Sequence, residues 1–224
     1  MIPSVKTNVA QLRRCALSRT TPLLFLTCCW LYGGQARAVL PDLIINRQLA
    51  VETVYFETRT FGPDDCAFIE GCTATTGQRK LLRFAIGFAN IGKGDLVIGD
   101  PRERPDMFTY SPCHGHYHFD GAASYWLLNS KGVRVRSSKK QAFCLLDFSK
   151  YANFGRKYKR YDCDYQGISS GWQDIYTKNL DCQWIDVTGL KPGNYTLRLK
   201  VNPLRKFEES NYRNNTASVP ITIH

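Results

Sequence analysis

Short runs of β-branched and aromatic residues recur along this chain and limit its fold more than any other feature. They span residues 50–58, 81–88, 122–128 and 195–201. Such composition favours strands. No window shows the apolar period of a long helix. The sequence therefore predicts an all-β fold, an antiparallel β-sandwich with long irregular loops stapled by disulfides.

Two polar segments predict turns between these strands. Asn129-Ser130-Lys131-Gly132 separates residues 122–128 from 133–136, and Lys191-Pro192-Gly193-Asn194 precedes the run that starts at residue 195. Asn, Gly and Pro adopt the backbone angles that tight turns need. We expect the first to join two strands and the second to open a later hairpin.

Residues 1–38 have the pattern of an export signal. Arg13, Arg14 and Arg19 precede an apolar run at 22–32, and Ala36-Arg37-Ala38 matches the small-x-small pattern cut by signal peptidase. That run is too short for a comfortable membrane span, so we expect no stable membrane insertion. The prediction is a signal peptide at 1–38 and one domain at 39–224, exported to the periplasm or secreted.

Loss of the signal changes the charge and the cysteine count. The chain carries a formal charge of +11 from 30 basic and 19 acidic residues, but five basic residues lie within 1–38, which leaves 25 against 19, or +6. Six of the nine cysteines stay: Cys66, Cys72, Cys113, Cys144, Cys163 and Cys182. An even number in an exported chain predicts three disulfides, with fifteen connectivities open.

Three of the four histidines, His114, His116 and His118, fall within five positions. Neutral imidazole suits copper and zinc, and three such ligands leave a coordination position open for chemistry. On a straight strand His114 and His118 would stand roughly 13 Å apart, near the limit for sharing one ion. We therefore expect a bend at Gly115, the residue that most easily permits one.

The segment 147–174 shows little strand pattern, and structureless segments of this length in compact domains tend to be functional. It interleaves basic and aromatic residues, namely Lys150, Tyr151, Phe154, Arg156, Lys157, Tyr158, Lys159, Arg160 and Tyr161. This composition suits a polyanion, but export argues against nucleic acid. The simpler interpretation is a solvated basic loop fastened by cysteines at either end.

Four longer motifs accompany the histidines: CHGHYH at 113–118, KQAFCLLD at 140–147, DIYTKNLDCQWIDVTGLKPGNY at 174–195 and ESNYRNN at 209–215. With them the chain resembles the catalytic domain of the lysyl oxidase family over nearly all of the mature region. Members of that family are copper amine oxidases that carry a lysine tyrosylquinone cofactor.

The resemblance implies roles for particular residues. His114, His116 and His118 would bind copper, and Lys140 and Tyr176 would crosslink to form the lysine tyrosylquinone. The implied disulfides are Cys66–Cys113, Cys72–Cys182 and Cys144–Cys163. Two departures stand out: Trp172 occupies the position of a cysteine of a further family disulfide, and Tyr110 replaces a histidine of animal members.

The implied activity is oxidative deamination of a primary amine, either peptidyl lysine or a small amine, to an aldehyde, with O2 as oxidant and release of hydrogen peroxide and ammonia. Asp174 would share a strand face with Tyr176, which suggests it as the proton-abstracting base. The competing hypothesis is a non-enzymatic extracellular adhesion-type module that holds a metal for stability. Such a module needs neither Lys140 nor Tyr176.

Overall fold

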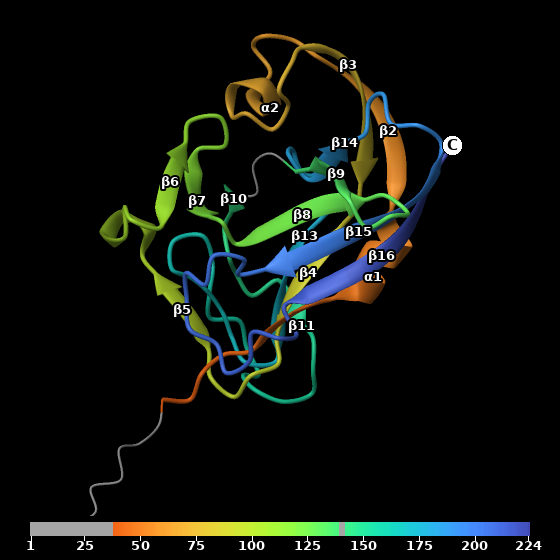
Figure 1. The fold of residues 1–224 in the computed structure, drawn as a ribbon. Coiled ribbons are helices and arrows are strands. Elements are labelled where there is room, and N and C mark those ends of the chain that lie inside the picture. Colours follow the sequence, from red (N-terminus) through yellow and green to blue (C-terminus); the bar gives the residue numbers. More distant parts are fainter. Residues whose placement is uncertain (1–37, 139–141) are drawn as a thin grey trace, which may run out of the picture. The chain divides into compact units, whose positions relative to one another are not determined.

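The computed structural model describes residues 38–138 and 142–224. The predicted signal peptide therefore lies outside the described residues, apart from Ala38, and so does Lys140. Figure 1 shows the course of the chain.

Within the described residues the strands form five sheets, and every pairing is antiparallel. One four-stranded sheet consists, in order, of β1 (Leu43–Ile45), β4 (Ile86–Asn90), β13 (Trp172–Tyr176) and β11 (Ser149–Lys150). The other consists of β16 (Thr216–Ile223), β15 (Gly193–Val201), β8 (Ala123–Leu128) and β9 (Arg134–Ser137). One three-stranded sheet consists of β10 (Ala142–Phe143), β7 (His116–Asp120) and β6 (Phe108–Ser111). The other consists of β14 (Trp184–Asp186), β3 (Gly77–Arg83) and β2 (Tyr55–Phe61). Strands β12 (Gln166–Ile168) and β5 (Leu96–Gly99) form the last pair. The all-β prediction is confirmed.

The sheet β16-β15-β8-β9 shows how alternation builds the core. Leu197 of β15 lies between Leu127 of β8 and Val219 of β16, and all three side chains are buried. The predicted turn at 129–132 joins β8 to β9, with the Asn129 side chain accepting from the backbone N–H of Val133 at 3.0 Å. Residues 191–194 lead into β15, whose partner β16 follows only after residues 202–215.

The strand predicted at 50–58 is wrong in its first half. Residues Arg47–Thr53 form helix α1, and only from Tyr55 does the chain extend as β2. The Asn46 side chain caps the helix by accepting a hydrogen bond from the backbone N–H of Leu49. This cap stabilises the helical conformation although the β-branched residues of the segment favour a strand. Ala50 is the residue through which α1 enters the core.

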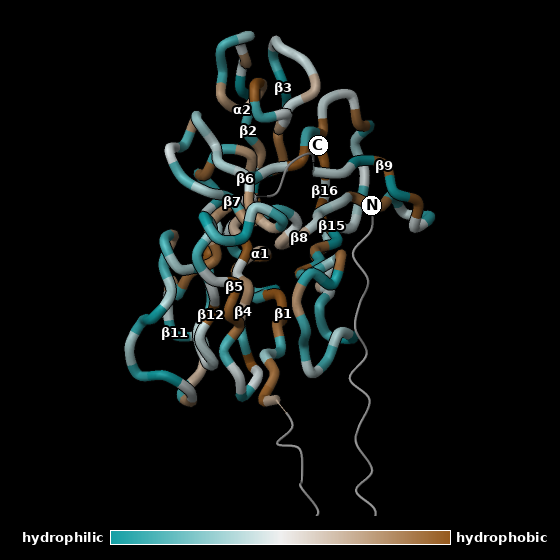
Figure 2. The backbone as a smooth tube through the Cα atoms, turned by 90° about the vertical axis from the view of Figure 1, so that its left-hand side faces the viewer, coloured by the Kyte–Doolittle hydropathy of each residue, from teal (hydrophilic) through white to brown (hydrophobic). Residues whose placement is uncertain are grey.

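The strand predicted at 81–88 is divided between two sheets. β3 ends at Arg83 and pairs with β2 and β14, whereas β4 begins at Ile86 and pairs with β1 and β13. At the break, the backbone N–H of Ala85 bonds to the Thr53 hydroxyl at 2.8 Å. Because the whole stretch from Leu81 to Asn90 is buried, its hydrophobicity gave no sign of the change of sheet. Figure 2 shows the apolar stretches of β1 and β4 in this interior.

Three disulfides link distant segments: Cys66–Cys113, Cys72–Cys182 and Cys144–Cys163. These are the pairings that the family resemblance implied, and all three are confirmed. The first ties helix α2 (Cys66–Ile69) to Cys113, the residue before His114. A 3-10 helix, η1, spans Pro101–Glu103.

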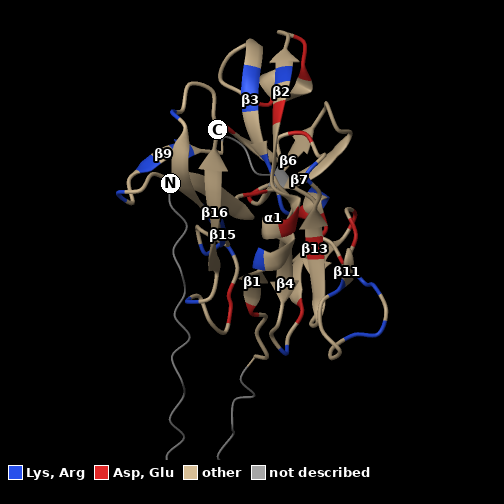
Figure 3. Cartoon of the chain, turned by 90° about the vertical axis from the view of Figure 1, so that its right-hand side faces the viewer, with Lys and Arg blue, Asp and Glu red and all other residues tan. Residues whose placement is uncertain are grey.

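The segment 147–174 has more order than its pattern predicted, because β11, β12 and the start of β13 lie in it. Residues 151–165 form no helix or strand, and Figure 3 marks in blue the Lys and Arg positions on the loop after β11. Asp95 accepts from Arg156 and Arg160. The Trp172 indole donates to the Arg156 carbonyl at 2.8 Å, so a hydrogen bond anchors this loop at the residue where the family has a cysteine.

Among the described residues, no helix is long and apolar enough to cross a membrane.

A buried carboxylate, Glu209, joins β1 to the connection at 202–215. It accepts from the Leu43 backbone N–H and from the side-chain amides of Asn202 and Asn215, each at 2.7 Å. Burial raises its pKa, while these hydrogen bonds act in the opposite direction.

Replacing Glu209 with alanine should destabilise the fold by roughly 2–5 kcal/mol, because buried donors lose their acceptor. The neighbouring Glu208 is exposed, so Glu208→Ala should change the free energy of unfolding by no more than about 0.5 kcal/mol. Denaturant unfolding of both variants measures this, and equal effects would contradict the role of Glu209.

Candidate active site

The histidine motif lies on the hairpin of β6 and β7. His116 and His118 belong to β7, while His114 precedes it in the turn. Gly115 has φ +69°, a left-handed conformation, and its N–H bonds to the Ser111 carbonyl at 2.8 Å. The bend predicted at Gly115 is confirmed, and it folds His114 back over the strand.

The turn brings the three imidazoles together. Nε2 of His118 lies 3.2 Å from Nδ1 of His114 and 3.2 Å from Nε2 of His116. Ligand nitrogens about 2.0–2.1 Å from one tetrahedral metal ion stand roughly 3.3 Å apart. The three rings therefore have the spacing of ligands to a single ion, and as imidazoles they suit copper or zinc.

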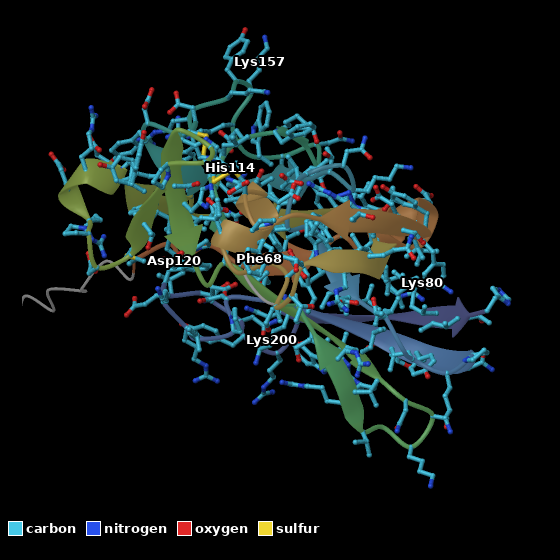
Figure 4. The ribbon with its side chains drawn as sticks, turned by 90° about the horizontal axis from the view of Figure 1, so that it is seen from above. Phe68, Lys80, His114, Asp120, Lys157 and Lys200 are labelled. Atoms are coloured by element: carbon cyan, nitrogen blue, oxygen red, sulfur yellow. A yellow bond between two sulfur atoms is a disulfide. The ribbon has the colours of Figure 1, made fainter. Side chains whose placement is uncertain are left out.

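Helix α2 supports this cluster from outside the motif. The Ser111 hydroxyl hydrogen-bonds to the Glu70 carboxylate, whose other oxygen lies 3.6 Å from Nδ1 of His114. The Cys66–Cys113 disulfide fastens the same segment to the turn. Figure 4 shows His114 close to the sulfur atoms of a disulfide.

Tyr176 lies at the end of β13 and is 2% exposed. Its ring meets Phe88 edge-on at 5.0 Å and Phe143 at 4.5 Å, and its hydroxyl donates to the Cys144 carbonyl at 3.5 Å. Burial raises the pKa of the Tyr176 phenol, and the charge of Asp174 raises it further. The ring is thus held in an apolar setting with its oxygen near polar groups.

Phe143 connects Tyr176 to the histidines. It lies on β10, which pairs with β7 next to the motif, and its ring centre is 6.0 Å from that of His118. One aromatic side chain therefore separates the tyrosine from the metal-binding candidates. This contact joins two segments that are far apart in sequence.

A cavity of about 270 Å³ opens at this point. His114, His116, Asp174 and Tyr176 line it, together with apolar residues such as Leu146 and Phe148. It is small beside the roughly 300–1,000 Å³ of typical ligand pockets. A narrow ligand suits such a space better than a bulky one does.

Asp174 shares the strand face of Tyr176, as alternation along the strand predicted, and is also 2% exposed. Burial raises its pKa well above the usual range of an aspartate, and hydrogen bonds from the backbone of Ile175 and Leu146 act in the opposite direction. A carboxyl and the tyrosine therefore line the same cavity.

Lys140 lies outside the described residues, so its predicted pairing with Tyr176 stays a prediction. The described chain resumes at Ala142 and enters β10 beside β7.

Two contributors to the site went unnoticed in the sequence. Phe143 is one of twelve phenylalanines, and nothing in its local pattern marks it. Glu70 lies far from the histidines in sequence, but the implied Cys66–Cys113 disulfide could have placed its segment beside them. Tyr110, which replaces a family histidine, is 49% exposed and packs on Tyr117.

Fold and site together define a disulfide-bonded all-β protein with a cluster of three histidines, two of which, His114 and His116, line one cavity with a buried tyrosine. The sequence model of the lysyl oxidase family matches residues 41–224. The chain belongs to the lysyl oxidase family.

Curated relatives agree with this assignment. Lysyl oxidase homolog 3B of Danio rerio is 36% identical over 183 residues, which cover 78% of this chain and 22% of the relative. Lysyl oxidase homolog 2 of Gallus gallus is 36% identical over 192 residues, 82% of this chain and 24% of the relative. Lysyl oxidase homolog 3 of Homo sapiens is 36% identical over 78% of this chain and 24% of its own length. The chain thus spans about a quarter of the length of these relatives.

Replacing His116 with alanine should abolish retention of copper, because two imidazoles cannot hold the ion as three do. The control is His224→Ala, which removes the exposed histidine at the last position. Metal content after dialysis measures both variants. One copper per chain retained by His116→Ala would contradict the proposed ligand set.

Replacing Cys66 and Cys113 together with serine should lower the free energy of unfolding by about 2–5 kcal/mol. It should also weaken copper binding, because the bridge ends one residue before His114. Titration of the folded variant with copper measures the second effect. An unchanged affinity would show that the bridge does not position the histidines.

Proposed function

We propose that this protein is a copper- and quinone-dependent amine oxidase, which deaminates primary amines to aldehydes and releases hydrogen peroxide and ammonia. The observation that carries the proposal is a cluster of three histidine nitrogens, two of whose residues, His114 and His116, line one cavity with Tyr176, in a chain of the lysyl oxidase family. His114, His116 and His118 would hold copper, and Tyr176 and Lys140 would provide the lysine tyrosylquinone.

Bound copper and the quinone would supply oxygen activation and an electron sink for the amine. The chain's own residues do the rest. Phe88 and Phe143 hold the Tyr176 ring and keep water from it. Leu146 and Phe148 give the cavity the apolar wall that an alkyl stem contacts, while the carboxyl of Asp174 is the acidic group beside the phenol.

Substrates consistent with this site are primary amines on unbranched stems, either peptidyl lysine or small amines. The three disulfides agree with a secreted or periplasmic location, where such bonds persist. The family assignment favours the enzyme over a non-enzymatic adhesion-type module, which would have no use for a quinone.

The test is peroxide release from a panel of peptidyl lysine and small diamines by the copper-loaded, aerated protein. Lys140→Ala and Tyr176→Phe should each lower turnover at least 100-fold, because each removes half of the crosslink. Lys139→Ala, which alters the neighbouring lysine, should keep activity. Peroxide release by the Tyr176→Phe protein at the rate of the unmodified protein would refute the proposal.

A further inference from the structure

Asp174 and Tyr176 are neighbouring residues of one strand face in the interior. The two residues lie two positions apart on β13 and face the same cavity as His114 and His116. Both side chains are 2% exposed, and the charge of Asp174 raises the pKa of the Tyr176 phenol. Any reaction that begins at the phenol oxygen therefore begins beside this carboxyl.

The remaining contacts of Asp174 orient it. Backbone groups of Ile175 and Leu146 hydrogen-bond to the carboxyl. Its Oδ2 atom is buried and has no hydrogen-bond partner among the described residues. An unpartnered buried carboxylate oxygen is costly and calls for a reason beyond packing.

The other acceptor near the phenol is less suited to proton transfer. The Cys144 carbonyl lies 3.5 Å from the hydroxyl oxygen, at the long limit of a hydrogen bond. An amide carbonyl is also far too weak a base to keep a proton. Asp174 is thus the group at this position that can take one.

We propose that the Asp174 carboxylate accepts the phenolic proton of Tyr176 in the step that opens the oxidation of this residue. The phenol O–H bond breaks, the proton moves to a carboxylate oxygen, and the electron pair stays on the phenolate oxygen. No electron passes to an oxidant in this step. The inference rests on the proposed function, because the later oxidation requires copper and O2.

The surroundings explain why an acceptor is needed. Burial disfavours the charged forms of both groups, which raises the pKa of Tyr176 and of Asp174. The Tyr125 hydroxyl raises the pKa of Tyr176 further, and the charge of Asp147 raises the pKa of Asp174 further. A cation held by the histidines at the same cavity would favour the ionised carboxyl and phenolate. Proton transfer would then follow metal loading.

The experiment follows quinone formation, separately from turnover. Metal-free protein is loaded with copper without oxygen, then aerated, and growth of the quinone absorption band and of the Lys140–Tyr176 peptide is recorded. Asp174→Asn should form the quinone at least tenfold more slowly with a normal copper content. Asp174→Glu, which keeps the acid, should recover part of the rate.

A chemical rescue separates proton transfer from a merely structural role. Formate should restore quinone formation in Asp174→Ala in proportion to its concentration, whereas chloride at equal ionic strength should not. The control is Asp106→Asn, since the exposed Asp106 carboxylate pairs with Arg104 at 3.1 Å, and its rate should equal that of the unmodified protein.

Quinone formation at the unmodified rate in Asp174→Asn would overturn the inference. So would an Asp174→Glu protein that binds copper but forms no quinone, a result that decides the matter even if the asparagine and alanine variants fail to fold. If the unmodified protein itself forms no quinone, the proposed function fails instead.

Discussion

The turn between β6 and β7 is the constraint on which the site depends. Without the left-handed conformation of Gly115, His114 would continue along the strand and could not reach the nitrogens of His116 and His118. The bridge Cys66–Cys113 and the contact between Ser111 and Glu70 hold that turn from the side of α2. Local backbone geometry and a long-range crosslink therefore produce one ligand set together.

The second half of the site comes from packing. β13 places Asp174 and Tyr176 in the interior, and β10 places Phe143 between Tyr176 and His118. The disulfide Cys144–Cys163 closes the same cavity at the residue whose carbonyl accepts from Tyr176. Burial thus shields the tyrosine from water while leaving acceptors at its oxygen, an arrangement suited to controlled oxidation.

The all-β fold, the bend at Gly115 and the shared strand face of Asp174 and Tyr176 could be predicted from the sequence, because they follow from local composition and local geometry. It predicted a strand where α1 forms, because the Asn46 cap stabilises a helix despite β-branched composition. It missed the break between β3 and β4, because the whole stretch from Leu81 to Asn90 is buried. The disulfide pairings followed only from the family resemblance, and the position of Phe143 depends on tertiary packing that no local pattern records.

Under the proposed function, Lys140 and Tyr176 form one cofactor beside the histidines. Peptide mapping by mass spectrometry tests it most directly, on protein that has been loaded with copper and aerated and on a metal-free control. We expect one crosslinked species that joins the Lys140 and Tyr176 peptides, present only in the copper-loaded sample. Amine oxidation by protein in which these two peptides are unlinked would contradict it.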